Sequence, residues 1–341
     1  MLSSAIFLIL AMLLLLGIEL AYMHIARRNG WTTQRNVRRD GHPVAVIGGG
    51  LIFYLGMVLW SLGMGIIYDV EAPGAYFLIG LTMLAATSFV DDILRLPVWL
   101  RLVVQFLAAS FLCFGFDPLY VHPLVALLFI VAVVGFVNGY NFMDGINGIT
   151  AAYSVVVLGV LLFIDLFTVR FASGSFIAVA LGSALIFGLF NFRRHALVFA
   201  GDVGSICMGF IICNLLTEYC ISQGDIFGLV MVSVYAVDIF ATIIRRIIEG
   251  ENILRAHRKH IYERLYFIWR VPQLVISTIY ALLQLGISVG YLYLSSDVSR
   301  LIYFLGVYGL LIAVYLIVMT LTERRIRRNI RGAARNAVER L

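Results

Sequence analysis

Charged residues are scarce in this 341-residue chain: Asp, Glu, Lys and Arg make up only 13% of it, whereas 62% is hydrophobic. The mean hydropathy is +0.99. No water-soluble domain of this size is so apolar, so the composition excludes a soluble enzyme or binding module. Long unbroken apolar runs also exclude a membrane β-barrel, which needs short alternating strands. The composition therefore indicates a polytopic membrane protein.

Cysteine is also rare, and several common site motifs are missing. The four cysteines all fall in apolar segments without metal-type spacing, so we expect buried thiols and no disulfides. A Walker A loop is absent, because no Gly-Lys-Ser/Thr sequence occurs. The chain shows no repeat, low-complexity tract or linker, and residues 1–341 are therefore expected to form a single domain.

Long apolar segments predict the fold. A transmembrane helix needs roughly 20 apolar residues, and we therefore expect an all-α bundle of about eleven transmembrane helices. The first segment lacks a basic n-region and a clear cleavage site, which favours a retained helix over a signal peptide. The expected spans are 3–23, 44–67, 74–90, 98–116, 121–137, 149–165, 175–191, 204–221, 226–244, 271–294 and 300–321.

Basic residues in the short loops predict the orientation. The loop after the first span is strongly basic, so we expect it in the cytoplasm, with the N-terminus outside and the C-terminus inside. Of the 25 Lys and Arg residues, only Arg170 and Arg300 then fall outside. The outer loops carry Asp69, Glu71, Asp117, Asp225 and Asp297. The inner loops, before an Arg-rich tail, carry Arg27, Arg28, Arg35, Arg38, Arg39, Arg193, Arg194, Arg245, Arg246, Arg255, Arg258, Lys259 and Arg264.

The net charge of +6 has a simple interpretation. The positive residues are spread over loops that would touch anionic lipid. Membrane lipids are therefore expected partners, and nucleic acid is not.

Four polar motifs fall at span ends that face the predicted cytoplasmic side. Carboxylates at membrane depth are costly and mark functional sites. Gathered on one face beside Gly-rich turns and basic loops, they indicate metal-assisted phosphate chemistry. The motifs are Asp91-Asp92, the run from Asn138 to Gly148, Gly201-Asp202-Val203-Gly204-Ser205, and His257-Arg258-Lys259-His260.

The first two motifs each allow a second interpretation. Adjacent carboxylates at Asp91 and Asp92 favour a cation partner, but a solvated turn with Arg95 as internal partner would also explain them. In a helical conformation Asn138, Asn141 and Asp144 would share one face. Asn and Asp side chains can hold a nucleobase or a hydrated metal ion. A polar loop explains this composition but not its spacing, which the later Asn147 continues.

The other two motifs are basic or Gly-rich. Free amides at a helix N-terminus beside Gly201 and Gly204 would form a phosphate cradle, unless Asp202 only caps that helix. In the last motif Arg258 can bind phosphate bidentately. Anionic headgroups would also attract such a loop, but they do not require two histidines.

Two further features lie outside these motifs. Asp238, inside the ninth span, is expected to line the same cavity, because an unpaired carboxylate there would be costly. Gly48-Gly49-Gly50, which opens the second span, predicts close helix packing or a flexible loop.

Together the motifs resemble the polyprenyl-phosphate N-acetylhexosamine-1-phosphate transferases, also called glycosyltransferase family 4. The resemblance runs in order from His42 and Gly48-Gly49-Gly50 to the stretch from His257 to Leu265. It implies that a polyprenyl phosphate attacks the sugar-linked phosphate of a UDP-sugar, giving a polyprenyl-diphosphate sugar and UMP. Mg²⁺ is the implied cofactor, with Mn²⁺ as the alternative. The implied location is the bacterial cytoplasmic membrane, with the active site on the cytoplasmic face.

Within that family the His-Arg stretch resembles members that start O-antigen, capsule or related surface-glycan chains. Phospho-N-acetylmuramoyl-pentapeptide transferase is the second candidate, and a membrane transporter is the alternative of another class. A lipid-headgroup transferase of the CDP-alcohol type is disfavoured, because its Asp-Gly-x-x-Ala-Arg signature is absent. A homodimer stays open.

The resemblance also implies roles for individual residues. Asp202 would be the main Mg²⁺ ligand, while Asp91 and Asp92 would assist the metal and orient or deprotonate the lipid phosphate. Asp144 and His257 would complete the catalytic group. The chain departs from the family at Asn147, where many relatives have Asp, and at Arg95, the third acidic position of an Asp-Asp-x-x-Asp pattern. The implied substrate-binding residues are Asn138, Asn141, Asn147, Arg258, His260, Gly204 and Ser205.

Overall fold

The computed structural model describes residues 2–33, 44–68, 74–116, 122–252 and 257–338, and in these ranges the regular elements are helices. Several charged loop residues used above to predict orientation lie outside the described residues: Arg35, Arg38, Arg39, Asp69, Glu71, Asp117 and Arg255. His42, at the start of the family resemblance, lies outside them too. The helices are α1 (Leu2–Arg28), α3 (Leu51–Tyr68), α4 (Ala75–Leu94), α5 (Val98–Gly115), α6 (Pro123–Phe142), α7 (Ile149–Phe167), α8 (Gly174–Asn191), α9 (Gly201–Gln223), η2 (Ile226–Val232), α10 (Ser233–Ile248), α11 (Ile261–Phe267), α12 (Gln273–Leu292) and α13 (Asp297–Val338).

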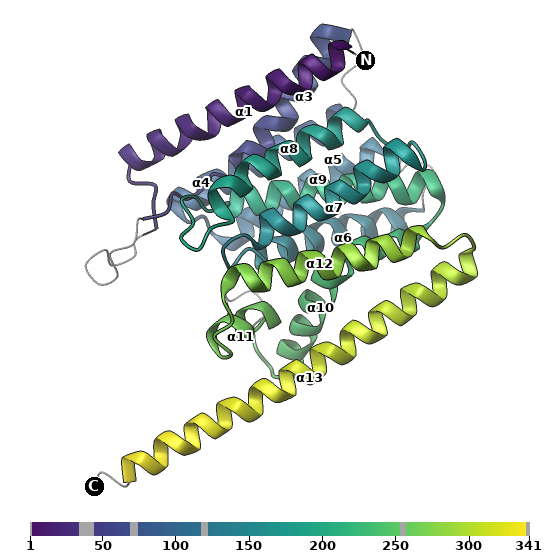
Figure 1. Cartoon of the computed structure of the whole chain (residues 1–341). Helices are drawn as coiled ribbons and strands as arrows, with labels where there is room; N and C mark the ends of the chain where they lie inside the picture. Colours follow the sequence, from purple (N-terminus) through teal and green to yellow (C-terminus); the bar gives the residue numbers. More distant parts are fainter. Residues whose placement is uncertain (1, 34–43, 69–73, 117–121, 253–256, 339–341) are drawn as a thin grey trace.

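Most of these helices can cross a membrane. In the described part of the chain, 10 helices are long and apolar enough to do so, η2 and α10 together forming one of them. The remaining expected span is α3, whose described apolar part, Leu51–Gly65, is shorter. An all-α bundle is thereby confirmed, with ten of the expected spans long enough in the described residues, while the orientation of the two termini stays a prediction. In Figure 1 the spans run side by side, with α1 and α13 at opposite edges of the bundle.

Helix α9 forms the centre of the bundle. In its most apolar stretch 78% of the residues are buried, compared with 11% in that of α13. Helix α9 packs on α3, α4, α6 and α7. Small residues allow these close approaches, as is usual between helices in membranes. A carbon added at Gly204 would lie 2.6 Å from the Cα of Gly50 at the start of α3. The close packing predicted for the Gly48-Gly49-Gly50 segment is therefore confirmed at Gly50.

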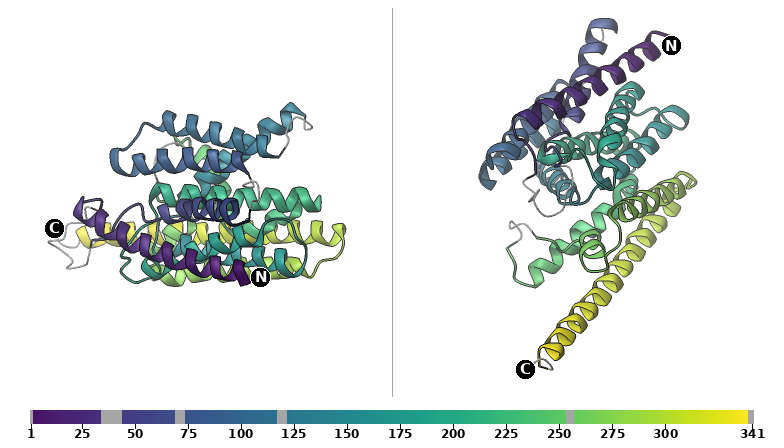
Figure 2. Two further views of the ribbon diagram at one scale, coloured as in Figure 1. Left: turned by 90° about the horizontal axis from the view of Figure 1, so that it is seen from above. Right: turned by 60° about the vertical axis from the view of Figure 1, so that its left-hand side comes forward.

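Short extended segments fix the first turn of α9 against α3. The amide of Val46 donates to the carbonyl of Leu197 (3.0 Å), and that of Phe199 donates to the carbonyl of Val46 (2.8 Å). The amide of Gly50 donates to Ala200 (3.1 Å). These bonds hold the first turn of α9 beside the start of α3, and the carboxylate of Asp92 joins the same turn to the last turn of α4. Figures 1 and 2 show the bundle from three directions.

The ninth span is broken where the 3₁₀ helix η2 meets α10. A broken span leaves backbone groups that need other partners inside a membrane. Gln284 of α12 supplies them: its Oε1 accepts from the amide of Val234 (3.1 Å), and its Nε2 donates to the carbonyl of Val230 (3.0 Å). The break lets α10 approach α13 and present Asp238 to the loop before α11.

Candidate active site

Two acidic residues from different helices meet at one arginine. Asp91 lies in the last turn of α4 and Asp202 in the first turn of α9. Nη1 of Arg101, on α5, lies 2.7 Å from Oδ2 of Asp91 and 3.1 Å from Oδ2 of Asp202. The cation partner expected for the acidic pair is therefore Arg101 and not Arg95, which is exposed and ends α4 with a φ of 54°.

Sequence reasoning missed Arg101. A usable signal existed, because Arg101 is the only charged residue in the expected span 98–116. A charge inside an apolar span is costly and therefore marks a functional or paired position. Its partner could not be named, since Asp202 is 101 residues away in sequence.

Asp92 caps helix α9. Its Oδ1 accepts from the amide of Asp202 (2.8 Å), and its Oδ2 accepts from the amide of Val203 (3.1 Å). Gly201 has a φ of 71°, and a side chain at this position would collide with the Asp92 carboxylate. The amides expected to cradle a phosphate are thus bound to Asp92. The alternative of Asp202 as the cap does not hold either, because the N-cap residue is Ala200 and has no side-chain cap bond.

Ser205 and Gly204 are buried beneath this cluster. The Ser205 hydroxyl donates to Oδ1 of Asn141 (2.7 Å) and so orients that side chain beside Asp202. Gly204 is in contact with Gly50 and Ala200. We expected these two residues to contact substrate directly. In the structure they instead pack beneath the cluster and hold Asn141 and the first turn of α9 in place. Asn141 remains at the edge of the cluster.

Asp144 belongs to the same site but not to helix α6. The helix ends at Phe142, so the expected common face holds for Asn138 and Asn141 and fails for Asp144 and Asn147, which lie in the loop. The Thr150 hydroxyl donates to Oδ1 of Asp144 (2.5 Å). Burial raises the pKa of Asp144 to about 7, opposed by the Thr150 bond and reinforced by the charges of Asp202 and Asp92. Asp144 is therefore close to these two carboxylates.

Asn138 pairs with another helix. Its Nδ2 donates to Oε1 of Gln105 (2.6 Å), and its Oδ1 accepts from Nε2 of Gln105 (3.3 Å). This amide pair joins α5 to α6, where two polar side chains facing the membrane interior need each other as partners. The expected contact of Asn138 with substrate is not supported by this geometry.

Asn147 is likewise engaged within the protein. Its Nδ2 donates to the carbonyls of Arg193 (3.1 Å) and Arg194 (3.2 Å), and its own amide donates to Oε1 of Gln273 (2.9 Å). Asn147 thus joins the loops before α7 and α9 to α12, and it does not face the carboxylates. An aspartate could not donate these two bonds, which explains the asparagine at this position.

The buried carboxylate of Asp238 anchors the histidine loop. Its Oδ1 lies 3.3 Å from Nδ1 of His260 and accepts from the amide of Ile261 (3.0 Å), and its Oδ2 accepts from the hydroxyl of Tyr280 (2.7 Å). Asp238 is therefore buried and bonded within the protein, so it is not the unpaired carboxylate that the sequence led us to expect. Nε2 of His260 is buried and has no partner among the described residues.

The histidine loop docks on the α6–α7 loop. The hydroxyl of Tyr262 donates to the carbonyl of Phe142 (2.7 Å), and a side chain at Gly145 would collide with that hydroxyl. The rings of His257 and His260 lie 4.9 Å apart, so the two histidines face the same region. Tertiary contacts thereby bring the second and fourth motifs together.

His257 and Arg258 differ in their surroundings. Burial, together with the nearby His260 and Arg246, lowers the pKa of His257 to about 4, so its ring is neutral at pH 7. Its Nδ1 is buried and unpartnered within the described part of the chain. Arg258 is exposed, with its guanidinium carbon 4.9 Å from the ring centre of Phe267. Arg258 is thus available to a ligand that approaches from solvent.

The carboxylates provide a donor set for Mg²⁺ only in part. Among the described residues, no group of three or more His, Cys, Asp or Glu side chains surrounds one metal position. Mg²⁺ needs less, because it keeps waters and takes one or two carboxylates plus substrate phosphates. Oxygens of Asp91 and Asp202 already converge on one cation. These two residues therefore fit Mg²⁺, whereas both oxygens of Asp92 are used by α9.

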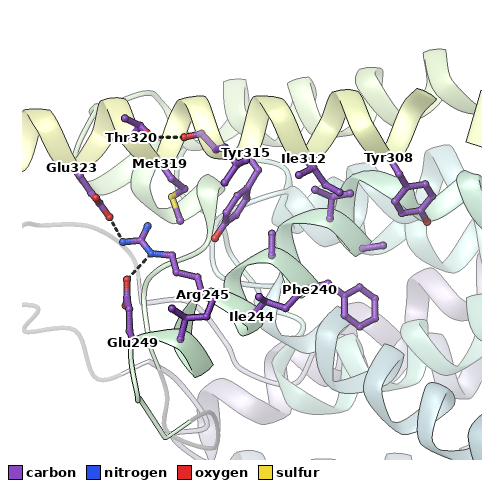
Figure 3. A pocket seen from close by; sticks show the side chains of 15 residues that line it. Phe240, Ile244, Arg245, Glu249, Tyr308, Ile312, Tyr315, Met319, Thr320 and Glu323 are labelled. Carbon is purple, nitrogen blue, oxygen red and sulfur yellow. Dashed lines mark hydrogen bonds and ion pairs between the residues drawn. The ribbon is translucent and has the colours of Figure 1, made fainter. Parts of the chain in front are cut away.

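A groove lies between α10 and α13 (Figure 3). Its volume is about 600 Å³, and its walls include Phe240, Ile244, Ile312 and Met319. At one end Arg245 binds Glu249 (2.6 Å) and Glu323. Glu249 also binds Lys259 (2.7 Å), so the charged end of the groove is joined to the histidine loop.

Comparison with known proteins gives consistent similarities. Residues 75–219, which include Asp91, Asp92, Arg101, Asp144 and Asp202, match the model of Glycosyl transferase family 4. Over 275 residues, 75% of each chain, the sequence is 28% identical to a probable undecaprenyl-phosphate N-acetylglucosaminyl 1-phosphate transferase of Bacillus subtilis.

Two further relatives carry related names. A phospho-N-acetylmuramoyl-pentapeptide-transferase of Carboxydothermus hydrogenoformans is 28% identical over 265 residues, 67% of this chain and 77% of the relative. A decaprenyl-phosphate N-acetylglucosaminephosphotransferase of Mycobacterium leprae is 26% identical over 278 residues, 68% and 69% of the two chains.

Proposed function

We propose that the chain, whose residues 75–219 match glycosyl transferase family 4, transfers a sugar 1-phosphate from a UDP-sugar to a polyprenyl phosphate. The products are a polyprenyl-diphosphate sugar and UMP. The observation that carries this proposal is the cluster in which Asp91 and Asp202 bind Arg101, with Asp92 and Asp144 close by, inside the range matched by the family. The names of the relatives support an N-acetylhexosamine as the sugar.

The chemistry needs two anionic reactants to approach. An oxygen of the lipid phosphate attacks the sugar-linked phosphorus, and the bond from that phosphorus to the UMP oxygen breaks. Mg²⁺, held by Asp91 and Asp202, would neutralise the charge of the phosphates. Positioning and electrostatic stabilisation supply most of the rate in such transfers, so no covalent enzyme intermediate is needed.

Asp144 has the properties of a proton acceptor. Its pKa of about 7 lies near that of a phosphate monoester, which is roughly 6. In its ionised form it would take the remaining proton from the lipid phosphate and raise the fraction of dianion that attacks. The neutral His257 and the unpartnered Nε2 of His260 would donate to or accept from the diphosphate and sugar.

The lipid substrate also needs an apolar surface. We place its isoprenoid chain along the groove between α10 and α13, because both walls are membrane-spanning helices and the charged end adjoins Lys259 (Figure 3). The site would then open on the cytoplasmic face of a bacterial inner membrane, where the family acts on UDP-sugars. The product would start a surface glycan such as O-antigen or capsule.

A panel of donor substrates tests this function. Purified protein in lipid nanodiscs would receive undecaprenyl phosphate, Mg²⁺ and one UDP-linked sugar at a time, with UMP release as the readout. Turnover of UDP-N-acetylglucosamine or another UDP-N-acetylhexosamine is the expected result. Turnover of UDP-N-acetylmuramoyl-pentapeptide alone would favour the pentapeptide transferase represented by the Carboxydothermus relative. Turnover of CDP-diacylglycerol without any UDP-sugar would refute the proposal.

A further inference from the structure

Arg101 uses its guanidinium in an unusual way. A single nitrogen, Nη1, donates to both Asp91 (2.7 Å) and Asp202 (3.1 Å), whereas structural arginines commonly bind carboxylates through two parallel bonds. The other oxygen of Asp91 accepts from the amide of Leu96 (2.6 Å) and fixes this carboxylate independently. The bridge therefore links α4 to α9 through one atom only.

In the described part of the chain, the rest of the guanidinium lacks hydrogen-bond acceptors. An arginine carries five N–H donors, yet Nε of Arg101 is buried and without a partner among the described residues. The side chain is nevertheless 29% exposed. Arg246 provides a contrast: it is 3% exposed and binds Glu251 through Nε (3.1 Å) and the carbonyl of Asn252 through Nη2 (2.6 Å). Arg101 thus combines an unused donor with a partly exposed side chain, whereas the Arg246 side chain is buried.

A metal ion and this arginine compete for the same oxygens. Mg²⁺ binds carboxylate oxygens at about 2.0–2.1 Å, and Nη1 already lies within hydrogen-bond distance of Oδ2 of both Asp91 and Asp202. Two cations this close to the same oxygens repel each other, so each weakens the binding of the other. Binding of Mg²⁺ therefore favours the release of Arg101 from these carboxylates.

We propose that Arg101 is an exchangeable counter-cation of the active site. In the free enzyme it neutralises Asp91 and Asp202 and keeps them together. When Mg²⁺ arrives it moves off these carboxylates, and its guanidinium binds a phosphate oxygen of a substrate beside the metal. This inference rests on the proposed function for the identity of the phosphate, but the exchange with Mg²⁺ does not depend on it. An arginine suits the second position because its planar fork matches phosphate.

Magnesium titration of the substrate-free protein tests the exchange. Isothermal titration calorimetry of the full chain in nanodiscs would compare the wild type with Arg101→Met, a neutral side chain of similar length. Where two bound groups influence each other's affinity, the effect is typically 5–150-fold. We therefore expect Arg101→Met to bind Mg²⁺ about tenfold more tightly, because the competing cation is gone.

Matched variants separate competition from other effects. Arg101→Lys keeps the charge and should bind Mg²⁺ as the wild type does. Arg95→Met removes a nearby exposed charge that does not touch the carboxylates, and it should also leave Mg²⁺ affinity unchanged. Arg101→Gln provides a second neutral variant if Arg101→Met fails to fold. Three results would each overturn the exchange. They are unchanged or weaker Mg²⁺ binding in the neutral variants, tighter binding in Arg101→Lys, and no Mg²⁺ binding by the wild type.

A second readout tests the phosphate role. At saturating Mg²⁺ the neutral variants should release UMP at least about tenfold more slowly than the wild type, since a positive charge beside the transferred phosphate is lost. Full turnover in Arg101→Met would overturn the phosphate role. The calorimetry contains no nucleotide sugar or lipid phosphate. Suppose that the neutral variants bind Mg²⁺ more tightly than the wild type, but the wild type transfers no sugar phosphate. That result would contradict the proposed function and leave the exchange standing.

Discussion

The backbone amide of Asp202 donates a 2.8 Å hydrogen bond to the carboxylate of Asp92, so two acidic residues of one cluster have different tasks. Asp92 directs both oxygens at the N-terminus of α9, where negative charge is favoured by the unpaired amides and the helix dipole. Asp202 directs its side chain away from the helix, to Arg101. Neutralising each residue should therefore have a different effect.

Asp92→Asn should lower stability. An asparagine has one acceptor oxygen and one NH₂ group, so one of the amides of Asp202 and Val203 would face a donor. Loss of a helix cap costs roughly 1 kcal/mol, and an unsatisfied buried donor about 1–3 kcal/mol. Thermal unfolding in nanodiscs should show a lower midpoint, while Asp297→Asn, at a side chain 93% exposed, should not change it. An unshifted midpoint for Asp92→Asn would contradict the capping role.

Asp202→Asn should instead abolish most activity in a folded protein. The change keeps the shape of the side chain but removes a hard anionic ligand. Loss of electrostatic stabilisation at a phosphoryl-transfer site costs on the order of 3 kcal/mol, or at least about 10²-fold in rate. UMP release should fall by that factor, with unfolding temperature close to that of the wild type. A variant with near-normal turnover and unchanged Mg²⁺ dependence would refute the metal role.

The pH dependence of transfer should reveal Asp144. Because burial raises its pKa to about 7, the ionised form that accepts a proton appears only above that pH. We expect kcat/KM to rise with pH through an apparent pKa near 7, and Asp144→Asn to give a low rate without this rise. His257, with a pKa lowered to about 4, does not titrate between pH 5 and 8. His257→Gln should therefore retain the rise, and its disappearance there would contradict the assignment.

Asn147→Asp should destabilise the protein. Its carboxylate would face the carbonyl oxygens of Arg193 and Arg194, to which Asn147 now donates. Loss of the two hydrogen bonds, with acceptor oxygens now facing each other, should lower the free energy of unfolding by about 1–3 kcal/mol. Thermal unfolding can measure this against Asn329→Asp on the exposed face of α13. Equal stability of the two variants would show that the loop contacts contribute little.

Cysteine labelling in intact cells should establish the orientation. In a background without native cysteines, Arg95→Cys and Lys259→Cys should resist an impermeant thiol reagent, while Ser295→Cys, in the loop before α13, should react. The expectation follows from the excess of basic residues in the loops of one side. Reaction of the first two positions from outside would reject both the topology and a cytoplasmic active site.

The amino-acid sequence by itself determined the helices and the end of the bundle where the site lies. Each apolar run of about 20 residues must satisfy its own backbone inside a membrane, and a helix does so locally. The ends of each span could therefore be predicted from the local sequence alone. Asp91, Asp202 and His260 were found in this way, because polar groups at such depths are costly and stand out against apolar neighbours.

Only the tertiary structure decided which polar group meets which. Arg101 and Asp202 are 101 residues apart, and Asp92 and the amide of Asp202 are 110 apart. Asn147 resembled a ligand residue by its spacing, yet the fold directs its amide at two carbonyls. Spacing along a chain defines the face of a single helix. Hydrogen-bond partners on other helices depend on how those helices pack, which local sequence does not specify.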